Sequence, residues 1–155
     1  MALHSALTTT NLHEPKGADS ASADQVYVFN GAGSGAATSI NNMNVVHVST
    51  TIPDISTAGS YWIVPGIAGD ITKIYSVIDG AITGADCGLT FEIAGTAITS
   101  SAITITQSGS AAGDVDSSTP SAANTITAAQ AVELITDGAS TGVVRSTITL
   151  VIDVS

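Results

Sequence analysis

A two-residue alternation near the end of the chain constrains the fold most. Ile148, Leu150, Ile152 and Val154 fall on one face, while Thr147, Thr149 and Asp153 fall on the other, with Val151 the one apolar residue among them. Successive side chains of a strand point to opposite faces, so this pattern predicts a half-buried β-strand. Ile and Val together number 30 against 6 Leu, an excess that favours strands over helices. We therefore predict an all-β domain.

Short β-forming runs recur along the rest of the chain, separated by turns rich in Gly, Asp and Asn. The runs cover residues 26–29, 45–49, 61–64, 71–78, 89–94, 103–106, 131–136 and 143–154. Eight runs in a chain of 155 residues fit a single jelly-roll-like β-sandwich with one core. The expected core includes Ile74, Ile78, Leu89, Phe91, Ile93, Ile103, Ile105, Leu134, Ile148, Leu150 and Ile152. Residues 108–124, rich in Ser, Ala, Gly and Asp, are predicted to form an exposed or contact loop.

The first 24 residues differ from the rest, because they lack any sustained periodicity. We predict that residues 1–24 form an extended arm and residues 25–155 the sandwich body. Pro15 restricts the arm's backbone, which lowers the entropy lost on docking. Leu3, Leu7 and Leu12 supply apolar anchors. These features predict that the arm attaches the protein to a partner.

The charge balance and the ends of the chain exclude several classes of protein. Thirteen acidic against three basic residues give a net charge of −10, which repels nucleic-acid phosphates and argues against direct DNA or RNA binding. We find neither an apolar run of 18 residues nor a signal-peptide pattern, so a membrane protein or a secreted protein is not expected. Cys87 is the only cysteine, which excludes an intrachain disulfide and predicts a buried structural thiol.

Two motifs resemble ligand-binding loops but lack essential parts. Residues 31–36 match a Gly-x-Gly-x-x-Ala dinucleotide fingerprint, yet the residues that follow are poor in helix formers. Residues 114–118 alternate oxygen ligands as a calcium loop does, but the sixth position is not Gly and Thr125 occupies the twelfth. The favoured interpretation is a turn in both cases, and no cofactor is predicted.

The histidines and the large aromatics give no sign of a catalytic centre. His4, His13 and His47 lack metal-ligand spacing, and His47 is expected on the polar face of its strand. With 19 Ser and 10 Asp, a Ser-His-Asp arrangement stays open, but nothing in the sequence singles one out. Tyr61 and Trp62 should point to opposite faces of a sheet, one into the core and the other toward an interface. No enzyme activity is predicted.

Four segments carry a family resemblance. They are Leu-His-Glu-Pro-Lys-Gly at residues 12–17, Val-Tyr-Val-Phe-Asn-Gly-Ala-Gly-Ser-Gly at 26–35, and residues 75–82 and 107–116. Together they resemble the head decoration, or capsid cement, proteins of tailed bacteriophages. The chain departs from that pattern at residues 36–38, where Ala-Ala-Thr stands in place of a bulky aromatic.

The resemblance implies a structural virion protein without catalysis or cofactors. Such a protein is made in the host bacterial cytoplasm, binds the outside of the capsid as a homotrimer and clamps neighbouring major capsid subunits. The capsid-binding residues that it implies are Leu12, His13, Glu14, Pro15, Lys16 and Gly17. The alternative is a tail-associated or receptor-binding β-module that engages host surface glycans.

Overall fold

The computed structural model describes residues 25–29, 35–39 and 44–154. The chain divides into two compact units, Met1–Asn44 and Val45–Ser155. In the first unit, β1 (Gln25–Phe29) pairs antiparallel with β2 (Gly35–Ser39). The strand expected at residues 26–29 is therefore part of a two-stranded sheet, separate from the sheets of the body. The predicted arm, residues 1–24, lies outside the described residues.

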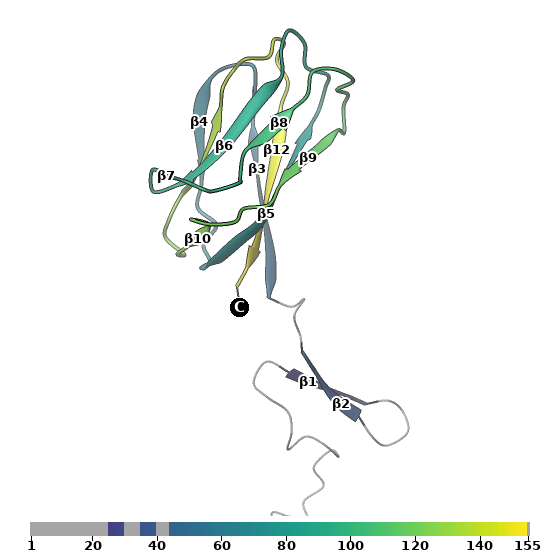
Figure 1. Ribbon diagram of the computed structural model, residues 1–155, viewed down its shortest axis with the longest axis vertical. Coiled ribbons are helices and arrows are strands. Elements are labelled where there is room, and N and C mark those ends of the chain that lie inside the picture. The colour runs from purple at the N-terminus through teal and green to yellow at the C-terminus, as the bar shows by residue number, and fades with distance from the viewer. Residues whose placement is uncertain (1–24, 30–34, 40–43, 155) are drawn as a thin grey trace, which may run out of the picture. The chain divides into compact units, whose positions relative to one another are not determined.

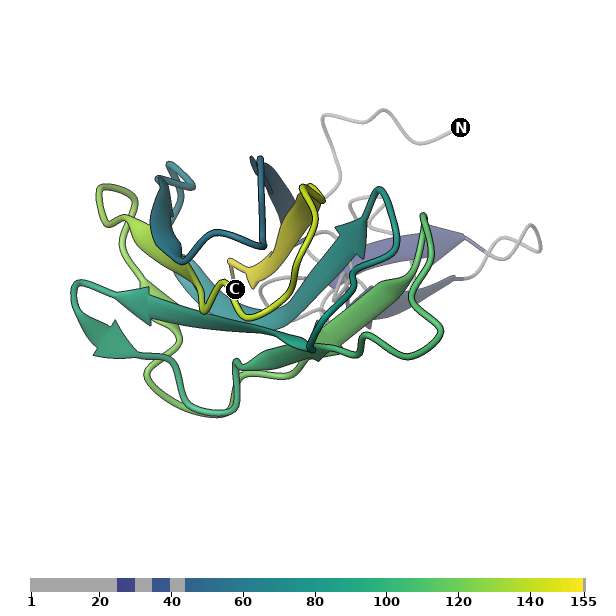
Figure 2. The ribbon, with the colours of Figure 1, turned by 90° about the horizontal axis from the view of Figure 1, so that it is seen from above.

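The second unit is a β-sandwich of two antiparallel sheets, without a helix among residues 44–154 (Figures 1 and 2). The first sheet contains β3 (Val45–Ile52), β12 (Ser146–Asp153), β5 (Gly69–Ile78), β9 (Val115–Ser118) and β10 (Thr125–Ile126). The second sheet contains β4 (Gly59–Ile63), β11 (Val132–Thr136), β6 (Cys87–Ile93), β7 (Thr96–Ala97) and β8 (Ile103–Ile105). The all-β prediction is confirmed.

One edge of each sheet is shared by two short strands. β9 and β10 pair with different parts of β5, on the side away from β12. In the same way, β7 and β8 pair with opposite ends of β6. Each sheet is therefore four strand positions wide, in the orders β3-β12-β5-β9/β10 and β4-β11-β6-β7/β8.

The core lies between the inner faces of the two sheets. All of the core residues predicted from the sequence are buried, so that prediction is confirmed. Alternation decides which face is buried: every second residue of β6, from Cys87 to Ile93, is buried, and so is every second residue of β12, from Ser146 to Ile152. Because each buried aliphatic side chain contributes about 1.5 to 3 kcal/mol, this repeated pattern drives the two sheets together.

The structure corrects the sequence analysis at two strands. Residues 108–124 are not wholly irregular, because β9 lies within them. Val115 is the only large apolar residue of β9, so the strand has no hydrophobic period. It is held by pairing with the backbone of β5. The last strand begins at Ser146 and not at residue 143, and Val143 is 81% exposed.

Aspartates organise the loops that connect the strands. Five of their carboxylates each accept a hydrogen bond from a backbone N–H group. The pairs, donor first, are Ser56 and Asp54 (2.9 Å), Arg145 and Asp79 (2.9 Å), Gln107 and Asp86 (2.7 Å), Ala111 and Asp114 (2.7 Å), and Gly88 and Asp137 (2.9 Å). Asp and Asn favour such local bonds in turns. Much of the acidic charge of the body is thus used to fix loops, which leaves part of the sheet surface free of carboxylates.

Candidate binding surface

The outer face of the first sheet is the broadest candidate surface, and we call it the hydroxyl face. Register places alternate side chains of β9, β5, β12 and β3 in rows across the sheet. From the row of Thr51, Thr147 and Val77 to the row of His47, Val151 and Lys73, the outward residues are His47, Ser49, Thr51, Lys73, Tyr75, Val77, Val115, Ser117, Thr147, Thr149 and Val151. None of these residues carries a carboxylate, whereas Asp153 and Asp70, which pair directly with each other, form the next row beyond them on the same sheet. Hydroxyl and methyl groups therefore dominate this face.

Several polar groups of the hydroxyl face are held by hydrogen bonds or ring contacts. The hydroxyls of Ser49 and Thr149 lie 2.8 Å apart. Lys73 donates from Nζ to Thr119 Oγ1 (3.0 Å) and lies 5.8 Å from the ring centroid of Tyr75. The one lysine of the body is thus held along the sheet, over an aromatic ring.

Exposed apolar side chains interrupt the hydroxyl groups near β9. Val77 is paired with Val115 across β5 and β9, and Tyr75 lies two residues before Val77 on the same face. All three are exposed, Val115 by 59%. Contiguous apolar groups on a surface mark contact sites, because covering them removes apolar area from water at about 25 cal/mol per Å².

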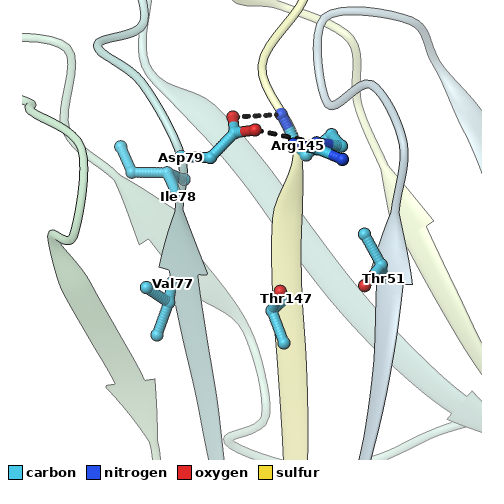
Figure 3. Close-up of a pocket in the computed structure, with 6 residues that line it drawn as sticks. All are labelled: Thr51, Val77, Ile78, Asp79, Arg145 and Thr147. Atoms are coloured by element: carbon cyan, nitrogen blue, oxygen red, sulfur yellow. Dashed lines mark hydrogen bonds and ion pairs between the residues drawn. The ribbon is translucent and has the colours of Figure 1, made fainter.

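A pocket of about 280 Å³ lies at one end of the hydroxyl face, where β5 ends and β12 begins (Figure 3). Its walls are Thr51, Val77, Ile78, Asp79, Arg145 and Thr147. Arg145 donates from Nε to Asp79 Oδ2 (2.8 Å) and from its backbone N–H to Oδ1 (2.9 Å). Both bonds lower the pKa of Asp79, and the bond from the Arg145 side chain has the larger effect.

The Asp79–Arg145 pair is exposed, so its own contribution to stability is small. It joins the end of β5 to the start of β12, together with a backbone bond from Asp79 N–H to Arg145 O (3.1 Å). The lining groups offer hydroxyls, methyl groups and a paired guanidinium. Such groups can hold a ligand by hydrogen bonds and apolar contacts, so the pocket is suited to binding.

The structure bears on only some of the residues singled out from the sequence. Leu12, His13, Glu14, Pro15, Lys16 and Gly17 lie outside the described residues, as do His4 and residues 31–34 of the glycine-rich motif. His47 is exposed on the hydroxyl face, as predicted. Of the aromatic pair, Tyr61 packs partly buried against the core and Trp62 is exposed on the opposite face, which confirms the predicted split.

Cys87 is buried, as the sequence predicted. Burial raises the pKa of its thiol, and Asp137 adds to the increase. The Cys87 Sγ atom lies 3.6 Å from the carbonyl oxygen of Ile55, which also accepts a 2.8 Å hydrogen bond from Thr136 Oγ1. A thiol with a raised pKa, buried at the end of a strand, is a poor nucleophile.

The calcium-like stretch at residues 114–118 is mostly a strand. Asp114 accepts the N–H of Ala111, and β9 follows at once. The pKa of Asp116 is raised, first by burial and then by the charge of Asp114. Within the described residues there is no group of three or more His, Cys, Asp or Glu placed to hold a metal ion.

The sequence analysis missed the part of the hydroxyl face that β9 contributes. The sequence places Val115 and Ser117 in a loop, because β9 has no apolar alternation. Tyr75 and Val77 could have been found, since they alternate with the buried Ile74 and Ile78. Only the pairing of β5 with β9 shows that these residues share one surface.

No protein-family model matches the chain, and neither a curated protein nor a solved structure matches it at a significant level. In the part of the chain that the structure describes, no helix is long and apolar enough to cross a membrane.

Proposed function

We propose that this protein is a non-enzymatic structural protein of a tailed-bacteriophage virion. It binds the outside of the capsid, stabilises the head by clamping neighbouring major capsid subunits and uses the hydroxyl face as its main contact. It is made in the host cytoplasm and ends on the outer surface of the virion. The proposal joins the resemblance of four sequence segments to the geometry of the body.

The proposal is supported above all by the contact between two of the four segments. Residues 75–82 and 107–116 are distant in sequence but lie side by side where β5 pairs with β9. Gly113 N–H donates to Ile78 O (2.8 Å), and Ile82 N–H donates to Ser110 Oγ (3.0 Å). The two segments supply Tyr75, Val77 and Val115, the exposed apolar part of the hydroxyl face.

The chemistry of the hydroxyl face suits a protein partner. Tyr is enriched at the centre of protein interfaces, and charged residues are depleted there. The absence of carboxylates from these rows spares the contact the cost of desolvating negative charges. The net charge of −10 keeps the protein soluble and away from DNA during assembly.

We further propose that the sandwich is a jelly roll, on the evidence of its strand order. When β7/β8 and β9/β10 each count as one interrupted strand, eight strand positions form two four-stranded sheets. The chain passes from one sheet to the other at every connection except the one between β6 and β7/β8. Jelly rolls occur in viral capsid proteins and in lectins, so the proposed fold agrees with the proposed function.

The proposed assembly is a homotrimer, in which residues 12–17 of the arm bind the capsid. β3 favours self-association, because its eight residues pair with β12 along one edge and contain neither Lys nor Pro to protect the other edge. Light scattering coupled to gel filtration should give three times the mass of the chain. A monomer at micromolar concentration would contradict self-association before capsid binding.

The test is co-sedimentation with heads of the encoding phage assembled without this protein. Wild type should sediment with the heads, whereas V77K/V115K should bind at least about tenfold more weakly, because two buried charges cost more than 1.4 kcal/mol. A128K/A129K, in the exposed turn between β10 and β11, adds the same two charges away from both sheet faces; it is the matched control and should bind like wild type. If wild type stays in the supernatant, or binds host cells instead of heads, the proposal is wrong.

A further inference from the structure

Trp62, the only tryptophan of the chain, lies on the outer face of the second sheet. It is 63% exposed, while its neighbours Tyr61 and Ile63 pack against the core. Val64, the next residue on the outer side, is also exposed. An exposed tryptophan on a regular strand leaves a large apolar ring in water, which marks a contact site.

Two carboxylates share the row of Trp62. Glu133 of β11 is the direct cross-strand partner of Trp62, and Glu92 of β6 is the direct partner of Glu133. Directly opposite residues point to the same side of a sheet, and neighbouring strands lie about 4.8 Å apart. We call Trp62, Glu133 and Glu92 the acidic row.

The acidic row is unfavourable for folding, because like charges directly opposite one another destabilise a sheet. The body has two basic side chains, and both are engaged on the first sheet or at its end. Lys73 bonds to Thr119, and Arg145 pairs with Asp79. The second sheet therefore carries two neighbouring carboxylates beside an open indole ring, without a cation from residues 44–154 to balance them.

We propose that the acidic row is a second docking surface, and that its partner is an arginine-bearing segment of another protein. A guanidinium group stacks on the face of an indole ring by a cation–π interaction and makes bidentate hydrogen bonds to carboxylates. The acidic row supplies both kinds of group side by side. A neutral sugar ring could stack on Trp62 but would gain nothing from two adjacent negative charges.

This second surface lies on the opposite side of the sandwich from the hydroxyl face. One copy can therefore contact two partners at once. The inference is independent of the proposed function, because an arginine peptide tests it without a capsid.

The experiment measures binding of the fluorescein-labelled peptide Gly-Arg-Gly-Arg-Gly by fluorescence anisotropy at low ionic strength. The same peptide with citrulline in place of arginine keeps the shape but loses the charge. We expect saturable binding of the arginine peptide and at least about tenfold weaker binding of the citrulline peptide, a difference of about 1.4 kcal/mol. Added salt should weaken the arginine complex.

Variants locate the site. E92Q/E133Q and Trp62→Ala should each weaken binding at least about tenfold. Asp70→Asn combined with Asp153→Asn is the matched control, because these two residues also lie directly opposite one another, on the first sheet. The control removes the same charge without an adjacent tryptophan and should bind the peptide like wild type.

Two readouts keep the result interpretable. E92Q/E133Q should melt no lower than wild type, because it removes a like-charge contact, so its loss of binding cannot be a folding defect. The inference is overturned if citrulline binds as well as arginine, or if the control loses as much affinity as E92Q/E133Q. It is also overturned if maltohexaose, and not the arginine peptide, changes Trp62 emission in a saturable way.

Discussion

Replacement of Phe91 by alanine tests the core most severely. Phe91 lies in the middle of β6, is 1% exposed and is the direct cross-strand partner of Leu134. A buried phenylalanine removes at least about 150 Å² from water, so loss of the ring beyond Cβ costs about 3 kcal/mol at 25 cal/mol per Å². The cavity left behind raises the total to about 3 to 5 kcal/mol. That is a large part of the 5 to 15 kcal/mol that typically stabilises a domain.

The assay is urea unfolding followed by far-ultraviolet circular dichroism. Trp62 fluorescence is a poor reporter, because the indole is already 63% exposed in the folded protein. With a slope of about 2 kcal/mol per molar urea, the midpoint of Phe91→Ala should fall by about 2 M. Thr90→Ala, an exposed neighbour on the same strand, should change the free energy of unfolding by no more than about 0.5 kcal/mol. A loss below about 1 kcal/mol for Phe91→Ala would refute the placement of its ring in the core.

Three further predictions concern acid, thiol reactivity and a turn. Hydrogen bonds that the Asp54 and Asp79 carboxylates accept in the folded protein lower their pKa values. The stability that these carboxylates contribute is therefore present above the ordinary pKa of 3.8 and is lost as the pH falls through the lower pKa values of the folded protein. Thermal melts from pH 5 downward should show this loss of stability, and Asp79→Asn should make the loss smaller. The thiol of Cys87 should react with Ellman's reagent only after unfolding, and complete reaction on mixing would contradict its burial. Gly138→Ala should cost about 2 to 3 kcal/mol in urea melts, because φ is +65° and a Cβ would overlap the backbone of the loop before β4. The control Gly95→Ala, at φ +77° in open space, should cost only about 1 kcal/mol, and equal losses would show that the overlap is absent.

The sequence predicts the strands that bury one clear face. β6 and most of β12 alternate between apolar and polar residues, so their apolar residues identify both the strands and the core, and Phe91 and Leu150 are buried as expected. β9 could not be predicted in the same way. Its residues Val-Asp-Ser-Ser have no hydrophobic period, and only the need of the β5 backbone for a hydrogen-bonding partner makes them a strand.

The two surfaces depend on contacts between residues far apart in the chain. Alternation places Tyr61 and Trp62 on opposite faces, but both are large aromatics, so local sequence does not decide which one is buried. The alignment of Trp62 with Glu133 and Glu92 depends on the register of three separate strands. Register between distant strands is fixed by packing of the whole core and not by local pattern. For the same reason, the pairing of Val77 with Val115 was beyond sequence reasoning.

The most direct test of the proposed function is a cryo-electron microscopy map of a phage head that carries this protein. The account predicts density for the sandwich on the outer surface of the shell, with Val77 and Val115 of the hydroxyl face turned toward major capsid subunits. A map in which the hydroxyl face points to solvent, or in which the outer surface of the shell carries no density for the sandwich, would contradict it.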